Sequence, residues 1–274
     1  KGEGLGNKFL SHIREVDAII HLVRCFESEK VTHVNSVINP INDLEVIKTE
    51  IILSDIDMIQ KKLSKNKKKL LKEKEIKILE EKLEQLNQNQ DISIENEDEK
   101  KFLSILGLLS IKPKIIVCNV DEKSLPNGNK YSDFCKKKFQ DENIIIVCAD
   151  IEDQIMGLQS NDRKDFMLES GIKSTGLDNL IKAGYKTLGL STFFTSGPEE
   201  SRAWTIEKNS KAVNAAGVIH TDFKKKFIRA ETVSHEDFIK YKGFNECKNA
   251  GKLRLEGKDY LVNDGDVMYF RVGS

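Results

Sequence analysis

The 274-residue sequence lacks Cys-x-x-Cys pairs, apolar runs long enough to cross a membrane, and an excess of either charge. The five cysteines are therefore expected to be reduced core residues of a cytosolic protein, with no metal site. No apolar run approaches the roughly 18 to 20 residues of a membrane span, so no membrane partner is expected. Lysine plus arginine equals aspartate plus glutamate at 44 each, so a nucleic-acid partner would have to bind a local basic surface.

The phosphate-binding motif G-x-x-x-x-G-K-[ST] is also absent. The segment GIKST at 171–175 approximates its end, but Ile172 and not glycine stands directly before Lys173. Met167 takes the place of the first glycine of the motif. Backbone N–H groups of such a loop cradle the phosphates, so the chain as given is expected to bind nucleotide weakly and not to hydrolyse it. The five histidines are scattered without the spacing of metal ligands, and none is assigned as a catalytic base.

The apolar residues that are present follow an α/β pattern interrupted by two long helices. Buried strands are expected at residues 18–26, 114–118 and 144–149. Helices are expected at residues 9–16, 102–109 (under the sheet), 131–140 and 176–188, the last with Leu177, Leu180, Ile181 and Tyr185 inward. Between residues 43 and 88, two apolar stripes separated by the basic segment 64–69 predict an antiparallel helical hairpin, and residues 85–99 a flexible return loop.

After Gly189 the pattern changes to that of a small α+β domain. Short strands are expected at residues 191–195, 202–206, 227–232, 260–262 and 267–272, with short helices near Val213 and Phe238. Residues 263–266 predict a tight turn between the last two strands, because Asp-Gly tolerates a positive φ. The expected domains are a partial α/β domain at 1–42 and 100–189, a helical insertion at 43–99, and an α+β domain at 190–274.

A candidate ligand site follows the strand at 114–118, because ligands of open α/β sheets bind beyond the carboxyl ends of the strands. GTP-binding domains read guanine at such a point with Asn-Lys-x-Asp. Here Asn119 is followed by Val120 in place of the lysine and by Glu122, one methylene longer than aspartate, and this departure favours adenine. The alternative is a helix capping box, in which Asn119 bonds first-turn N–H groups and Glu122 folds back.

Several segments taken together resemble the YchF or Obg-like ATPase family. They are KGEGLGN at 1–7, HLVRCFE at 21–27, NVDE at 119–122, RAWTI at 202–206, GVIHTDF at 217–223, GKDY at 257–260 and DGDVM at 264–268. The resemblance implies a Ras-like P-loop NTPase domain, an inserted coiled-coil hairpin and a C-terminal TGS domain, which is a ubiquitin-like β-grasp module. It also implies a cytoplasmic, monomeric protein that binds the ribosome or RNA and hydrolyses ATP in preference to GTP with Mg²⁺.

The same resemblance assigns roles to individual residues. Gly2, Gly4 and Gly6 would end a switch loop beside the γ-phosphate, and Asn119, Val120 and Glu122 would read the base. Cys148 and Ala149 would close over the base, although simple core packing explains Cys148 equally well. The P-loop and its Mg²⁺-binding Ser/Thr would lie upstream of Lys1, so no catalytic residue or metal ligand is expected in this chain.

Two groups of basic residues could neutralise phosphates. The first lies at the hairpin tip, where a solvated helix end is the preferred interpretation: Lys61, Lys62, Lys65, Lys67, Lys68 and Lys69. The second lies in the last domain, near Trp204, Phe223 and Phe227: Lys224, Lys225, Lys226, Arg229, Lys252, Arg254 and Lys258. TGS domains resemble RNA- or ribosome-associated modules, which favours the second group. The alternative to an ATPase is a non-catalytic RNA- or ribosome-binding adaptor.

Overall fold

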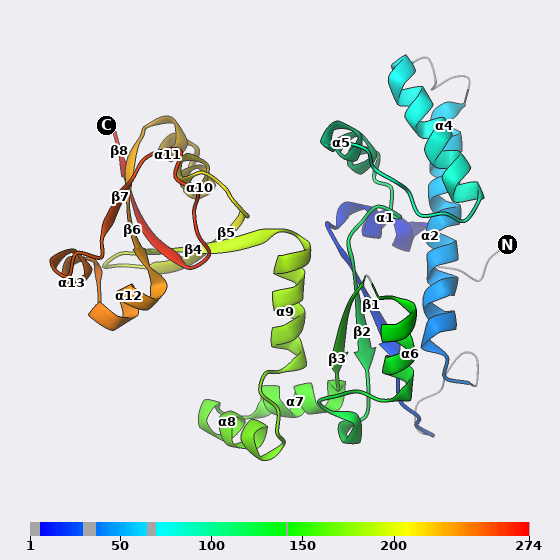
Figure 1. Ribbon diagram of the computed structural model, residues 1–274, viewed down its shortest axis with the longest axis horizontal. Helices are drawn as coiled ribbons and strands as arrows, with labels where there is room; N and C mark the ends of the chain where they lie inside the picture. Colours follow the sequence, from blue (N-terminus) through cyan, green and yellow to red (C-terminus); the bar gives the residue numbers. More distant parts are fainter. Residues whose placement is uncertain (1–5, 30–36, 65–69, 141, 274) are drawn as a thin grey trace. The chain divides into compact units, whose positions relative to one another are not determined.

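The computed structural model describes residues 6–29, 37–64, 70–140 and 142–273, which belong to two compact units, residues 1–187 and 188–274 (Figure 1). The helical hairpin lies within the first unit, so the division of that unit into separate domains stays a prediction. None of the described helices combines the length and the apolar character needed to cross a membrane.

The first unit is built on a three-stranded parallel sheet in the order β1-β2-β3. The strands are β1 (Ile19–Arg24), β2 (Lys114–Asn119) and β3 (Asn143–Val147). Residues 115–118 of the central strand are all buried, as expected for a parallel strand covered on both faces. The sequence predicts that β1 is buried too, but Ile20 is 54% and Leu22 65% exposed. That prediction is wrong because β1 is an edge strand of the described sheet, with one face packed.

Helices cover the two faces of this sheet (Figure 1). They are α6 (Lys130–Lys138) on one face and α9 (Gly176–Thr187) on the other. Ile116 and Cys118 pack with α6, whereas Ile115 and Val117 pack with Leu180 of α9, because successive side chains of a strand point to opposite faces. Leu177 and Ile181, predicted to point inward, are 42% and 51% exposed. The side of α9 that meets the sheet is therefore narrower than its apolar residues suggest.

The remaining helices of the first unit include two that no sequence pattern predicts. The elements are α1 (Asn7–Glu15), α2 (Pro40–Leu63), α4 (Glu73–Asn87), α5 (Glu97–Leu106), the 3₁₀ turn η1 (Glu122–Ser124), α7 (Ala149–Gly157) and α8 (Ser160–Glu169). The two unpredicted helices, α7 and α8, share a small apolar cluster of their own, formed by Ile151 and Ile155 with Phe166 and Met167.

The predicted helical hairpin is present as α2 and α4, which pack together through Ile52, Ile59, Leu79 and Leu86. α2 starts at a proline, after the Asn39 side chain that accepts a hydrogen bond from the Asn42 N–H. Residues 65–69 of the predicted basic tip lie outside the described residues. α5 starts earlier than predicted, within the expected return loop, and Leu103 packs in the hairpin cluster and not under the sheet.

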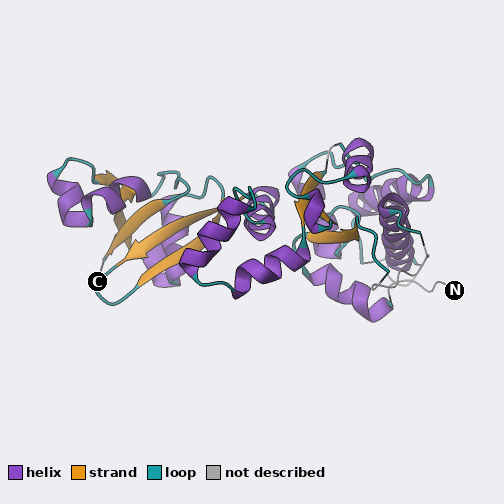
Figure 2. Cartoon of the chain, turned by 90° about the horizontal axis from the view of Figure 1, so that it is seen from below, coloured by secondary structure: helices purple, strands orange, loops and turns teal. Residues whose placement is uncertain are grey.

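The second unit contains a five-stranded sheet in the order β5-β4-β8-β6-β7, in which β4 and β8 are parallel and the other pairs antiparallel. Its strands are β4 (Leu190–Ser196), β5 (Ser201–Glu207), β6 (Phe227–Ser234), β7 (Arg254–Glu256) and β8 (Asp266–Val272). Its helices are α10 (Ala212–Ile219), α11 (Thr221–Lys225), α12 (His235–Tyr241) and α13 (Phe244–Asn249). The strands and helices of the unit are coloured separately in Figure 2.

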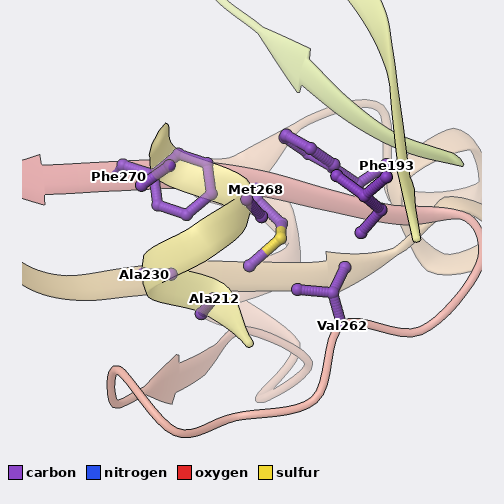
Figure 3. Packing of buried hydrophobic residues seen from close by; sticks show 9 residues of the cluster. Phe193, Ala212, Ala230, Val262, Met268 and Phe270 are labelled. Carbon is purple, nitrogen blue, oxygen red and sulfur yellow. The ribbon is translucent and has the colours of Figure 1, made fainter. Parts of the chain in front are cut away.

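The core of the second unit lies between α10 and one face of this sheet (Figure 3). It contains Phe193, Ala212, Ala230, Val262, Met268 and Phe270. The predicted strand at 260–262 is wrong, since this segment makes only an isolated bridge between Lys211 and Leu261. Tyr260 and Val262 pack on the core, which explains why this segment alternates like a strand. The strand that the sequence pattern did not predict is β7, which pairs with β6. The turn at 263–266 is present, with Gly265 at φ +86°, but it joins a loop to β8.

Candidate functional site

The carboxyl end of β2 brings together segments that are far apart in the sequence (Figure 1). The Cys25 N–H, just beyond β1, donates a hydrogen bond to the Asn119 carbonyl oxygen over 2.8 Å. The Val120 N–H donates to the Val147 carbonyl oxygen at the end of β3, also over 2.8 Å. The turn at 119–122 therefore lies at the edge where all three strands end, which is where open α/β sheets bind ligands.

The side chain of Asn119 connects this turn to the first residue of α7. Its Oδ1 accepts a hydrogen bond from the Ala149 N–H over 3.0 Å. The capping-box alternative is therefore wrong: the short turn η1 starts after Asp121, and the Asn119 side chain does not bond its N–H groups. Because the oxygen is the acceptor, the amide Nδ2 of Asn119 stays available as a donor, and no described residue accepts a hydrogen bond from it.

The other predicted base-reading residues divide into core and surface positions. Val120 and Cys148 are each only 2% exposed, and burial raises the pKa of the Cys148 thiol. Both support the turn from inside the core, and contact of Cys148 with a base stays a prediction. Glu122 and Ala149 are exposed. The surface that a ligand could meet thus consists of the Asn119 amide, the Glu122 carboxylate and the start of α7.

Asn129 is a supporting residue that sequence reasoning missed. Its Nδ2 donates hydrogen bonds to the Cys25 carbonyl oxygen over 2.7 Å and to Ser124 Oγ over 3.1 Å, and its Oδ1 accepts from the N–H groups that start α6. It therefore joins the end of β1, the turn η1 and α6. A usable signal was present, since Asn129 with Ser132 three residues later forms a capping box.

The predicted switch loop is described only at Gly6, while Gly2 and Gly4 lie outside the described residues. Gly6 is the N-cap of α1, and a Cβ added there would meet no atom within 4 Å. Its φ of −53° is open to any residue. The structure therefore gives no local reason for glycine at position 6, and its role beside a γ-phosphate stays a prediction.

The helix that follows Gly6 is fixed to the hairpin by the guanidinium of Arg14. This group donates to Asp55 Oδ1 over 3.1 Å, to the Gly107 carbonyl oxygen over 2.6 Å and to Ser54 Oγ over 2.6 Å. Asp55 is fully buried and also accepts hydrogen bonds from the Leu109 and Ser110 N–H groups over 3.0 and 2.7 Å. One buried carboxylate thus holds α1, α2 and the chain after α5 together.

The basic residues of the second unit do not all present free charges. Arg254 lies 3.0 Å from Asp266, whose carboxylate is buried, and donates a hydrogen bond to the Tyr260 hydroxyl. Lys224 and Arg229 are exposed, on α11 and β6. The other four predicted residues are exposed as well: Lys225, Lys226, Lys252 and Lys258. At the hairpin tip, Lys61 pairs with Asp57 over 2.5 Å.

The first unit is thus an α/β unit with a candidate ligand-binding turn at the carboxyl edge of its sheet, and the chain shares its fold with a solved GTPase and a GTP binding protein. The chain resembles the YchF GTPase of Schizosaccharomyces pombe with a TM-score of 0.85 and 33% identity, over 98% of this chain and 76% of that chain. A GTP binding protein from Pyrococcus horikoshii OT3, at a TM-score of 0.60 and 17% identity over 97% of this chain and 81% of that one, shows a likeness of fold alone.

Sequence comparisons narrow this class to one family. Residues 190–273 match the family model YchF-GTPase_C, described as a protein of unknown function (DUF933). The ribosome-binding ATPase YchF of Bacillus subtilis (strain 168) is 46% identical over 99% of this chain and 77% of that protein. The protein of the same name from Haemophilus ducreyi is 44% identical with the same coverage. The chain belongs to the YchF family, which confirms the family resemblance of its motifs.

Proposed function

We propose that the protein is a cytoplasmic, monomeric, ribosome-associated nucleotide hydrolase that binds ATP in preference to GTP. Support for the class comes from relatives named ribosome-binding ATPase YchF, whose similarity extends over 99% of the chain. Support for base recognition comes from one observation above all: Asn119 Oδ1 accepts a hydrogen bond from the Ala149 N–H, which leaves Nδ2 available as a donor to a ligand. In this proposal residues 43–99 are the inserted coiled-coil domain and residues 190–274 the TGS domain.

The preference for adenine follows from donors and acceptors at the turn. Guanine recognition by Asn-Lys-x-Asp needs a carboxylate that accepts from the ring N–H and the amine together. The carboxylate here is Glu122, an exposed residue of η1 whose longer side chain disturbs that paired geometry. Adenine presents a ring nitrogen acceptor, which the Nδ2 donor of Asn119 satisfies, and an amine, which backbone carbonyl oxygens at the edge of the sheet accept.

Hydrolysis requires a second half of the site. The phosphates and Mg²⁺ need the backbone N–H groups and the Ser/Thr hydroxyl of a G-x-x-x-x-G-K-[ST] loop, which the 274 residues do not contain. Among the described residues, no group of three carboxylate or histidine ligands lies together beside the turn to hold Mg²⁺. On their own, these 274 residues should bind nucleotide weakly and act as a binding adaptor, which is the alternative function.

The preference is tested by titrating the intact protein with ATP and GTP. ATP should bind more tightly, and Asn119→Ala should weaken ATP binding by about tenfold, because a lost hydrogen bond of about 1.4 kcal/mol corresponds to that factor. Glu122→Asp should improve GTP binding, and exposed Asn127→Ala serves as the control. Equal or reversed affinities for the two nucleotides would count against adenine reading.

Ribosome or RNA binding is tested on the lysines at the end of α11, of which Lys226 is the C-cap. Replacing Lys224, Lys225 and Lys226 together by alanine should weaken binding and reduce the slope of log affinity against log salt by about 2, since each phosphate contact to a single strand contributes about 0.7. The matched control removes three other exposed lysines of the same unit: Lys208, Lys240 and Lys248. A slope unchanged by the first triple variant, or reduced equally by the control, would remove α11 from the interface.

A further inference from the structure

Three thiols meet in the core beneath the Asn119 turn. The Sγ atoms of Cys25, Cys118 and Cys135 lie within 4.8 Å of one another, and all three residues are 0% exposed. They come from the end of β1, from β2 and from α6. Within the described part of the chain, no other group of three potential metal-ligating side chains lies this close together. Sequence spacing cannot reveal the cluster, because its members are distant along the chain.

The backbone holds the cluster together independently of its sulfur atoms. The Cys25 N–H donates to the Asn119 carbonyl oxygen, immediately after Cys118, over 2.8 Å. The Cys25 carbonyl oxygen accepts from Asn129 Nδ2, and Asn129 caps the helix that carries Cys135. Each of the three segments is thus tied to another by a main-chain or capping hydrogen bond. The three sulfurs form a preorganised set, which lowers the ordering cost of binding.

The walls of the cluster decide which ion would suit it. The three cysteines belong to a hydrophobic cluster that also contains Leu44, Ile116 and Val120. Zn²⁺ normally takes four ligands, and the described residues supply only these three. Three thiolates around Zn²⁺ would also leave one uncompensated negative charge, and around Cu⁺ two, on residues that are fully buried from solvent. A trivalent, three-coordinate ion with affinity for sulfur leaves no net charge.

We propose that Cys25, Cys118 and Cys135 form a binding site for trivalent arsenic. The thiols must lose their protons as the ion binds. Arsenous acid supplies the acceptors: three As–O bonds break, three As–S bonds form, and the thiol protons leave with the hydroxides as three water molecules. Arsenic stays trivalent and sulfur is not oxidised, so the exchange needs no further reactant.

Binding would join β1, β2 and α6 covalently, directly below the turn that carries Asn119. The arsenic site itself does not depend on the proposed nucleotide function. An effect of arsenic on ATP affinity would depend on both, so the two are measured separately. Because the thiols are buried, binding should require local opening of the core and should therefore be slow compared with diffusion.

The test is native mass spectrometry of the reduced, folded protein incubated with arsenite. The expected product is one adduct whose mass increases by one arsenic less three hydrogens, with three thiols lost to a thiol reagent. Removing one thiol by Cys118→Ala or Cys135→Ala should weaken binding by about a hundredfold, because one of three linked attachments is lost. Cys118→Val fills the same space with an apolar group, and it replaces Cys118→Ala if that variant does not fold.

Two other buried cysteines provide matched controls. Cys148→Ala and Cys247→Ala should leave the adduct and its affinity unchanged, because neither residue belongs to the cluster. The proposal is overturned if the folded protein forms no adduct at high arsenite, or if Cys118→Val and Cys135→Ala retain it. It is also overturned if Zn²⁺ displaces arsenic from the protein, because that would contradict the charge argument.

Discussion

The buried carboxylate of Asp55 should carry a large share of the stability of the first unit. Asp55→Ala removes a partner from the Arg14 guanidinium, which is 19% exposed, and leaves the N–H groups of Leu109 and Ser110 without an acceptor. Breaking a buried ion pair costs about 3 to 5 kcal/mol and each unsatisfied N–H about 1 kcal/mol or more. Arg14 keeps its bonds to Gly107 and Ser54, which favours the low end. At the low end, about 3 kcal/mol for the pair and about 1 kcal/mol for each N–H give an expected loss of about 5 kcal/mol.

The assay is urea unfolding of the folded protein, followed by a signal from the first unit. With a slope of about 2 kcal/mol per molar urea, the midpoint should fall by about 2.5 M. Asp55→Asn keeps one oxygen acceptor but loses the charge, and it should cost roughly half as much. The slope should be unchanged, because the variant alters stability and not the surface exposed on unfolding.

A control residue lies two positions further along the same helix. Asp57 is 62% exposed and pairs with Lys61, so Asp57→Ala should change stability by about 0.5 kcal/mol or less. If Asp55→Ala also cost less than about 1 kcal/mol, the network would not hold α1, α2 and the chain after α5 together, and the reasoning from burial would fail.

Two further predictions concern other buried titratable side chains, those of Lys82 and His21. Lys82 is fully buried 2.8 Å from the Glu99 carboxylate, so Lys82→Ala should lower the free energy of unfolding by about 3 kcal/mol or more. The double variant Lys82→Met with Glu99→Leu should recover most of this stability. Equal urea midpoints for the single and the double variant would refute the prediction. Burial, aided by Lys114, lowers the pKa of His21 to about 4, so the unfolded chain takes up the proton first as pH falls. Stability should therefore decrease between about pH 6.5 and 4, by up to about 1.4 kcal/mol per unit, in the native protein and in the control His12→Gln but not in His21→Gln.

Local sequence patterns predicted those elements of the first unit whose apolar residues could be buried in only one kind of secondary structure. The apolar run of β2 and the helical stripes of α2 and α4 are examples, since each could be buried in only one way. The exposure of Ile20 and Leu22 could not be predicted, because it depends on which strands pair beside β1. Tyr260 and Val262 resemble a strand because packing on a core alone produces the same alternation.

The candidate site was predicted only in part, for a similar reason. Asn119 stood at the end of a recognisable strand, so its position followed from the sequence. Its bond to the Ala149 N–H and the support from Asn129 depend on contacts between segments about 30 and 100 residues apart. The thiol cluster shows the limit most clearly, because Cys25 and Cys118 become neighbours only through the parallel pairing of β1 with β2.

The parallel pairing of β1 with β2 also affects the rate of folding. Ile19 pairs with Lys114, so about ninety residues form a loop that must close before the sheet can form. Closing such a loop costs about 4 kcal/mol of chain entropy, whereas prior pairing of α2 with α4 makes the free loop about twofold shorter and saves about 0.6 kcal/mol. Contacts within the hairpin are local and should form first. The hairpin would then bring the two strands together during folding and speed their pairing about threefold.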